Sequence, residues 1–167
     1  MAFCKTLSIF TCIVIMLTLG LLQPSQAQNS PQDFLDAHNA ARAAVGVGDM
    51  EWSDEVAAYA EQYANQRIDD CAMQHSNGQY GENLAEMSDD SLDAAGAVKM
   101  WVDEGENYDY DSNTCTTGQD QCLHYTQVVW RDSVQLGCAR VVCNTGGTFI
   151  ICNYNPPGKE PSQKVLT

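Results

Sequence analysis

QLGCARVVCNTGGTFIICNY, residues 135–154, consists of two stretches rich in Val, Ile, Phe and Tyr on either side of a polar turn. The turn, Asn-Thr-Gly-Gly at 144–147, has the composition that joins paired strands, so the segment predicts a β-hairpin. With this turn, the numbers of paired positions are expected to sum to 291. Cys138 and Cys152 sum to 290, which brings them close enough for a disulfide across the strands.

The chain has eight cysteines, and two of them lie within residues 1–27, a segment that we expect to be removed. Six then remain, and an even number predicts disulfides in a secreted protein. Cys115 and Cys122 flank a short loop and could close on each other. That would leave Cys71 for Cys143, but six cysteines allow many connectivities, so spacing alone does not settle the pairing.

Residues 1–27 have the composition of a secretory signal. Lys5 precedes an apolar stretch of sixteen residues at 7–22, and small residues stand just before the end at Ala27. We expect cleavage after Ala27, which leaves one mature domain at 28–167. The apolar stretch is shorter than the roughly 20 residues that span a bilayer, and no second one follows, so no stable membrane insertion is expected.

Acidic residues dominate the charged side chains. The chain has 22 Asp and Glu against 8 Lys and Arg, and loss of Lys5 with the leader changes the formal charge from −14 to −15. Such a surface repels nucleic acids and anionic lipid headgroups, so neither is expected as a partner. A neutral lipid remains open as a ligand, and the protein is expected to be a monomer.

Three segments have helical periodicity, at about 30–45, 53–68 and 91–105, and the first two begin at serines that can cap a helix. Helices followed by strands without strict alternation predict an α+β domain with helices packed on an antiparallel sheet. Residues 125–130 favour a strand by propensity. The tail at 156–167 is polar and has no periodicity.

Two histidines and two glutamates carry the reactive chemistry expected of the chain. His75 begins HSNGQYGENLA, which contains Glu82, and His124 begins HYTQVVW. Glu104 lies between them, near the end of a helical pattern. Two imidazoles and two carboxylates can form either a metal site or an acid–base cluster. His38 lies among the core positions of the first helix, so its role is expected to be structural.

Five segments together carry a family pattern. They are DAHNAAR at 36–42, YGENLA at 80–85, MWVDE at 100–104, HYTQVVW at 124–130 and CNYNPPG at 152–158. In this order, over some 120 residues, they make the mature chain resemble the CAP superfamily of cysteine-rich secretory proteins, antigen 5 and pathogenesis-related proteins. Within it, the chain is most similar to the plant class-one pathogenesis-related proteins.

The resemblance implies a fold and a set of disulfides. The fold is a three-layer α-β-α sandwich with a central antiparallel sheet, in which 124–130 forms a helix. We adopt this helix over the strand that propensity favours, because tertiary packing often overrides β propensity. The implied disulfides agree with the pairing considered above; they are Cys71–Cys143, Cys115–Cys122 and Cys138–Cys152.

The resemblance also implies that His75, Glu82, Glu104 and His124 meet in one cleft. In some relatives the two histidines bind a zinc-like cation. With two histidine ligands such a site would be open and weak, and no cofactor is required. The alternative is a hydrogen-bonded polar cluster that fixes the shape of the cleft.

A sterol-binding loop of the family matches residues 101–113 of this chain. Trp101, Tyr108 and Tyr110 would there line an apolar pocket for a ring system. Alternatively, these aromatic side chains only pack the loop against the helix.

The expected function is antifungal plant defence in the extracellular apoplast, by binding the sterols of fungal or oomycete pathogens, without catalysis. A metal-dependent hydrolase at the His/Glu cleft is the alternative, although the His-Glu-x-x-His spacing of zinc proteases is absent. A third expectation is release of the tail at 156–167 as a defence-signalling peptide. The chain departs from that pattern at Lys159, where Asn is usual, and lacks the usual Pro-Tyr ending. Leu123, beside His124, replaces a usual glycine.

Overall fold

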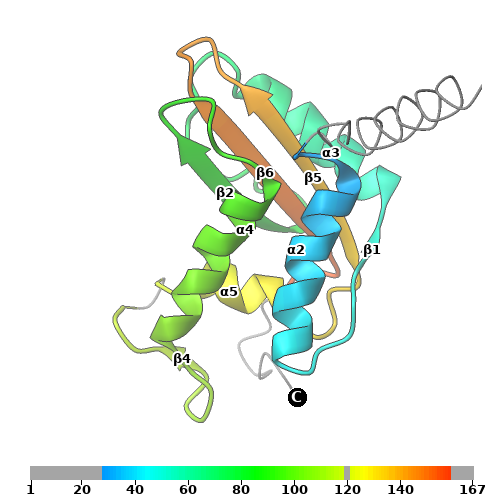
Figure 1. Ribbon diagram of the computed structural model, residues 1–167, viewed down its shortest axis with the longest axis vertical. Coiled ribbons are helices and arrows are strands. Elements are labelled where there is room, and N and C mark those ends of the chain that lie inside the picture. Colours follow the sequence, from blue (N-terminus) through cyan, green and yellow to red (C-terminus); the bar gives the residue numbers. More distant parts are fainter. Residues whose placement is uncertain (1–27, 119–120, 159–167) are drawn as a thin grey trace, which may run out of the picture.

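A four-stranded sheet separates two helical layers in the computed structural model, which describes residues 28–118 and 121–158 (Figure 1). The strand order is β1 (Glu51–Trp52), β5 (Gln135–Val142), β6 (Thr148–Asn155) and β2 (Gly81–Met87). Helix α3 (Asp54–Gln66) packs on one face, and the other face carries α2 (Pro31–Ala44), α4 (Ala94–Asp103) and α5 (Leu123–Val128). The predicted three-layer α+β fold is confirmed. The signal at 1–27 and the tail from 159 lie outside the described residues.

The hairpin β5–β6 forms the centre of the sheet, with a register one residue from the predicted one. Cys138 lies opposite Cys152 and Val142 opposite Thr148, so paired numbers sum to 290. The turn is closed by the Cys143 N–H, which donates to the Gly147 carbonyl. Because side chains alternate along a strand, this register places both cysteines on the same face of the sheet.

The outer strands differ from the expected antiparallel sheet. The short strand β1 pairs parallel to β5, so the sheet is mixed, whereas β2 pairs antiparallel to β6. The sequence of β2, GENLAEM, contains Gly, Asn and two Glu, which have low β propensity, and gave no prediction of a strand. Contacts with the rest of the chain define this strand: the Trp101 indole of α4 donates to the Leu84 carbonyl at 2.9 Å.

The predicted helix starts are correct for α2 and α3. Ser30 forms a capping box with Asp33, and the Ser53 side chain accepts the N–H of Val56. Helix α4 begins later than the predicted residue 91, because the Asp93 side chain is its cap. The chain then continues as a 3-10 helix, η1 (Glu104–Asn107), and a two-stranded hairpin of β3 (Tyr108–Asp109) and β4 (Thr114–Cys115).

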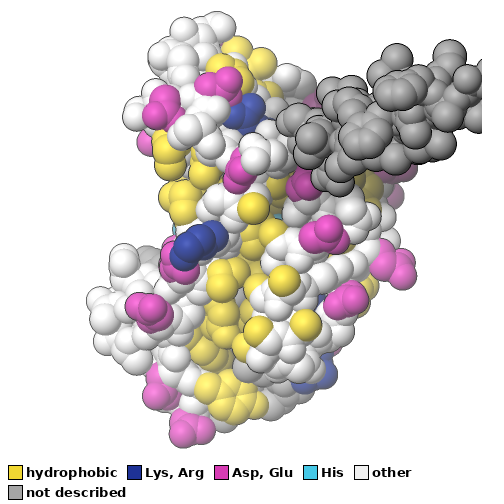
Figure 2. All heavy atoms as spheres, in the orientation of Figure 1, with side chains coloured by type: hydrophobic (Ala, Val, Ile, Leu, Met, Phe, Trp, Pro, Cys, Tyr) yellow, Lys and Arg dark blue, Asp and Glu magenta, His cyan; other side chains and the backbone are white. Residues whose placement is uncertain are grey.

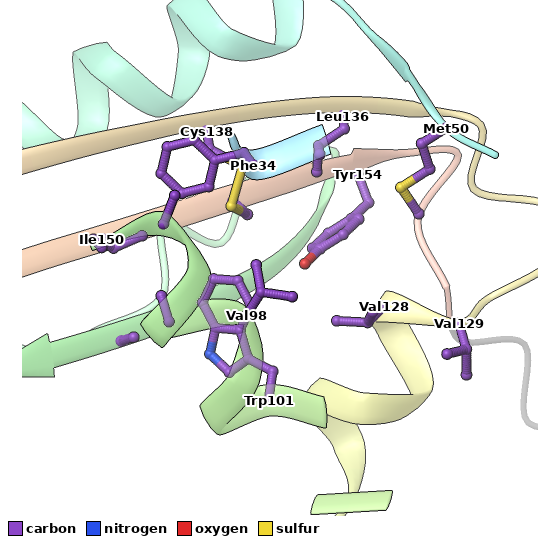
Figure 3. Packing of buried hydrophobic residues seen from close by; sticks show 14 of the residues in the cluster. Phe34, Met50, Val98, Trp101, Val128, Val129, Leu136, Cys138, Ile150 and Tyr154 are labelled. Atoms are coloured by element: carbon purple, nitrogen blue, oxygen red, sulfur yellow. A yellow bond between two sulfur atoms is a disulfide. The ribbon is translucent and has the colours of Figure 1, made fainter. Parts of the chain in front are cut away.

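The apolar core lies on both sides of the sheet. The larger cluster joins the sheet to α2, α4 and α5 and contains Phe34, Trp101 and Tyr154 (Figure 3). A smaller cluster lies between the sheet and α3. There β5 has Gly137, at which a Cβ atom would lie 2.1 Å from the backbone nitrogen of Ala57. Only glycine permits α3 to approach the sheet this closely.

Of the three disulfides, two fasten peripheral segments and one joins the central strands β5 and β6. They are Cys71–Cys143, Cys115–Cys122 and Cys138–Cys152, the same pairs that the family resemblance implies. The first joins the segment after α3 to the end of β5, and the second joins β4 to the start of α5. In the described part of the chain, no helix combines the length and apolar character that a membrane span requires.

Helix α5 forms where propensity favoured a strand, because buried contacts hold it. Its Val128 and the following Val129 are fully buried. Arg42 of α2, itself fully buried, donates from its guanidinium to the carbonyls of Val128 and Trp130 at 3.1 and 2.7 Å. It also donates to the carbonyls of Gly48 and Arg131. Burial lowers the pKa of Arg42 to about 10, so the guanidinium stays protonated at neutral pH.

We expect Arg42→Met to destabilise the fold by about 3 kcal/mol or more, because methionine leaves several buried carbonyls without a donor. Lys99→Met is the control, since Lys99 forms an exposed ion pair with Asp103 at 2.7 Å, and its loss should cost under about 1 kcal/mol. Urea unfolding of both variants measures the difference. Equal destabilisation would contradict a special role for Arg42.

Candidate functional site

A cavity of about 630 Å³ opens between the segment before β2, the start of β2, α5 and the chain after β6. Hereafter it is called the groove. Three of the four predicted cleft residues line it: His75, Glu82 and His124. The others are Ser76, Asn77, Gly78, Tyr80, Gly81, Asn83, Leu123, Gln127, Pro157 and Gly158. Glu104 does not line the groove but contacts His124, which does.

His75 and Glu82 form the first of two similar pairs. The Nδ1 atom of His75 lies 2.7 Å from Oε1 of Glu82, which also accepts the backbone N–H of Ser76 at 3.0 Å. The Ser76 hydroxyl donates to Oε2 of the same carboxylate, and Asn153 Nδ2 contacts it at 3.3 Å. The Glu82 side chain is 7% exposed and His75 is 56% exposed. Glu82 is therefore a buried anchor that orients an accessible imidazole.

His124 and Glu104 form the second pair. Oε1 of Glu104 lies 2.7 Å from Nδ1 of His124, and Oε2 accepts the backbone N–H of His124 at 3.0 Å. Glu104 is the first residue of η1, directly after α4, so it reaches the start of α5 from another element. A carboxylate at a helix N-terminus satisfies a free N–H and interacts favourably with the helix dipole. Glu104 thus fixes both the ring and the backbone of His124.

Both pairs leave the second ring nitrogen for other contacts. A carboxylate accepts, so each Nδ1 carries a hydrogen and the Nε2 atom of the neutral ring has the lone pair. In the described ranges, no three His, Cys, Asp or Glu side chains gather as a set that could hold a metal ion. A cation would therefore have two imidazoles as its protein ligands and waters elsewhere, because both carboxylates are engaged with Nδ1 atoms.

A buried hydrogen-bond chain connects α2 to the groove. His38 Nδ1 donates to the Phe34 carbonyl at 2.7 Å, so its Nε2 accepts the Tyr154 hydroxyl at 2.9 Å. Asn83 Nδ2 then donates to the Tyr154 oxygen at 3.1 Å and to the His124 carbonyl at 3.0 Å. Burial is the main cause that lowers the pKa of His38 to about 4 and that raises the pKa of Tyr154. His38 is structural, as the helix pattern predicted.

The aromatic residues of the predicted sterol loop occupy different environments. Trp101 is 2% exposed and belongs to the core. Tyr108 packs against Tyr125 with ring centroids 5.9 Å apart, and its hydroxyl donates to Asn113. Tyr110 is 40% exposed. None of the three lines the groove.

Sequence reasoning missed the roles of Ser76, Asn83 and Asn153. Asn83 lies within a segment that matched the family, but nothing local indicates that its amide joins β6 to α5. Asn153 donates to Gly81 and Glu82, and its buried Oδ1 has no hydrogen-bond partner among the described residues. Turning the amide over would set Oδ1 against two acceptors, so the observed orientation is the favourable one.

Comparison with known proteins gives consistent matches. The family model for the cysteine-rich secretory protein family, CAP, matches residues 35–154. Pathogenesis-related protein 1A of Nicotiana tabacum is 61% identical over 144 residues, which cover 86% of this chain and 85% of that protein. Pathogenesis-related protein 1 of Arabidopsis thaliana is 52% identical over 96% of this chain and 98% of its own length.

Two solved structures of similar fold are from more distant proteins. NaASP2, solved with Zn²⁺, superposes with a TM-score of 0.65 at 25% identity, over 84% of this chain and 88% of that one. Venom allergen-like protein 4 of Schistosoma mansoni superposes with a TM-score of 0.64 at 23% identity, over 83% and 94% of the two chains.

We expect His38 to make the fold less stable in acid. The unfolded chain protonates His38 near its ordinary pKa of 6.5, whereas the folded chain resists protonation until about pH 4. Its effect is therefore absent above pH 6.5 and grows as the pH falls towards 4, to about 3 kcal/mol of lost stability. The difference between the stability–pH curves of the natural chain and His38→Gln isolates this contribution, and NMR should find the ring neutral at pH 5. A ring that titrates near 6.5 in the folded protein would contradict the prediction.

Proposed function

The chain belongs to the CAP family of cysteine-rich secretory proteins, and we propose that it is a secreted plant defence protein that binds sterols of fungal or oomycete pathogens. Its plant relatives, named pathogenesis-related protein 1, support the defence role. Three disulfides agree with an extracellular protein, since such bonds persist in oxidising compartments. The apoplast is the compartment we propose.

The contacts that Glu82 and Glu104 already make speak against either carboxylate as a general base and support a binding role. A general base needs a carboxylate or imidazole that can take a proton from the reacting group. Glu82 already accepts contacts from His75, Ser76 and Asn153, and Glu104 accepts two from His124. Both carboxylates are thus occupied in holding the shape of the groove.

The sterol proposal rests on an apolar band on the face of the molecule opposite α3. Figure 2 shows hydrophobic side chains gathered along the face formed by α2 and α4. On α2 the partly buried hydrophobic residues are Leu35, Ala37 and Ala41, while Met100 of α4 is 45% exposed. The pair Tyr108–Tyr125 packs against the same core cluster. An apolar surface bordered by aromatic rings suits a rigid, neutral ring system.

We expect the purified mature protein to bind radiolabelled sterol saturably, and Met100→Lys to weaken that binding severalfold by placing a charge on the band. Val142→Lys is the matched control, because Val142 is also 45% exposed but lies on β5. His75→Gln with His124→Gln should leave sterol uptake intact, since both residues line the groove. Absence of saturable binding, or equal effects of the two lysine variants, would refute the proposal.

A weak cation site in the groove is the second candidate function. It is favoured by the two imidazoles whose Nδ1 atoms are oriented by carboxylates, an arrangement common around metal-binding histidines. NaASP2, similar in fold, was solved with Zn²⁺. His75 and His124 would hold the ion, with Glu82 and Glu104 as their orienting partners. A bound zinc ion would supply a polarised water, as the hydrolase alternative requires.

We expect Glu82→Gln to lower any zinc affinity by about 10–100-fold, the usual effect of losing the partner of a ligating histidine. Glu86→Gln is the control, because Glu86 is an exposed residue of the same strand. Calorimetric titration with zinc measures both variants. If the natural chain binds no zinc, or if the two variants match, the groove is a polar cluster only.

Hydrogen bonds hold the chain just after Asn155, where release of the C-terminal peptide would cleave it. The Ser133 hydroxyl donates to the Pro156 carbonyl at 2.7 Å, and the Gly158 N–H donates to Gln127 Oε1 at 2.9 Å. Release after Asn155 would therefore remove one wall of the groove. Residues 159–167 lie outside the described part. Mass spectrometry of extracellular fluid that never detects residues 156–167 as a fragment would eliminate this alternative.

A further inference from the structure

Asn77 and Gly78 lie at the rim of the groove, two and three residues after His75. They form the single Asn-Gly dipeptide of the sequence. Both residues are exposed, both line the groove, and neither belongs to a helix or strand. Neither residue belongs to the apolar band or to the His75–Glu82 and His124–Glu104 pairs.

The local geometry suits both of these residues. Asn77 has φ of 56°, in the left-handed region that asparagine tolerates better than most residues, and its Nδ2 donates to the His75 carbonyl at 3.2 Å. At Gly78 a Cβ atom would lie 1.8 Å from the hydroxyl oxygen of Tyr59. That hydroxyl in turn donates to Ser76. A side chain at residue 78 would therefore have to displace the Tyr59 hydroxyl, and glycine avoids this.

This dipeptide is chemically labile. The backbone nitrogen of a glycine is unhindered by any side chain and can attack the side-chain amide carbon of the preceding asparagine. We propose that Asn77 is a site of spontaneous deamidation. In this reaction the Gly78 N–H, which donates to the Ser76 hydroxyl at 3.3 Å, gives its proton to solvent base, and the nitrogen bonds to Cγ of Asn77. The Cγ–Nδ2 bond then breaks as Nδ2 takes a proton from water and leaves as ammonia. Addition of one water opens the resulting cyclic imide to aspartate or isoaspartate.

The products change the groove beside its accessible histidine. Either product adds a carboxylate near Glu82, so the groove becomes more negative. Isoaspartate also inserts an extra methylene into the backbone between Ser76 and Gly78. The backbone N–H and the hydroxyl of Ser76 both donate to Glu82. A shift of the backbone at Ser76 would therefore weaken the contacts that hold Glu82 in place beside His75. Deamidation would thus change the groove as the protein ages, whichever ligand the protein binds.

Asn113 provides a matched internal control. It also has a left-handed backbone, with φ of 57°, but threonine follows it. The folded mature protein would be incubated at neutral and mildly alkaline pH and digested. Labelling by isoaspartate methyltransferase and peptide mass mapping would then be compared at the two positions. We expect Asn77 to convert severalfold faster than Asn113, to convert faster at the higher pH, and to yield a species with one additional negative charge.

Asn77→Gln tests the assignment, since glutamine forms the corresponding larger ring far more slowly. The variant should lose the acidic species that appears first on ageing, while its unfolding in urea should show only a small loss of stability, because glutamine tolerates the left-handed backbone less well than asparagine. Persistence of that species in the variant would overturn the proposal. So would conversion of Asn77 no faster than Asn113, or conversion in the unfolded chain but not in the folded one.

Discussion

The position of α5 depends on the buried guanidinium of Arg42. A fully buried charge is tolerated only when its hydrogen bonds are satisfied, and here backbone carbonyls satisfy it rather than a carboxylate. Two of those carbonyls, of Val128 and Trp130, belong to the end of α5 and the residues after it. A cation is favourable at a helix C-terminus, where the free carbonyls and the negative end of the dipole lie. The contacts with Arg42 therefore stabilise a helix in a short apolar segment whose local propensity favours a strand.

The opposite end of α5 is held by a charge of the opposite sign. Glu104 accepts both the ring and the backbone N–H of His124, and Asn83 donates to the carbonyl of the same residue. Across the groove, Glu82 makes a similar double contact with His75 and the next backbone N–H. Each imidazole is thus oriented by a carboxylate that also holds main chain. The groove keeps its shape through polar contacts anchored in the sheet.

Two surfaces of different chemistry result from this arrangement. The groove lies between α5 and β2, combines polar and apolar lining, and presents the histidines His75 and His124, which are 56% and 32% exposed. The band over α2 and α4 is apolar and continues the core outward (Figure 2). A neutral lipid and a hydrated cation need opposite environments, so each proposed ligand has its own surface. The proposed deamidation site, Asn77, lies at the rim of the groove and not on the apolar band.

Sequence by itself determined the features whose causes lie within a few residues: the hairpin at 135–154, from its turn and β-branched flanks, and the starts of α2 and α3, from capping serines. The cleft residues could be grouped only through the family resemblance, because no local pattern connects His75 with His124. Local propensity predicted neither the strand β2 nor the helix α5, and the helix was expected only from the family resemblance. The partners that satisfy the backbone of these elements, such as Arg42, lie far away in the chain, and local propensity contains no information about them.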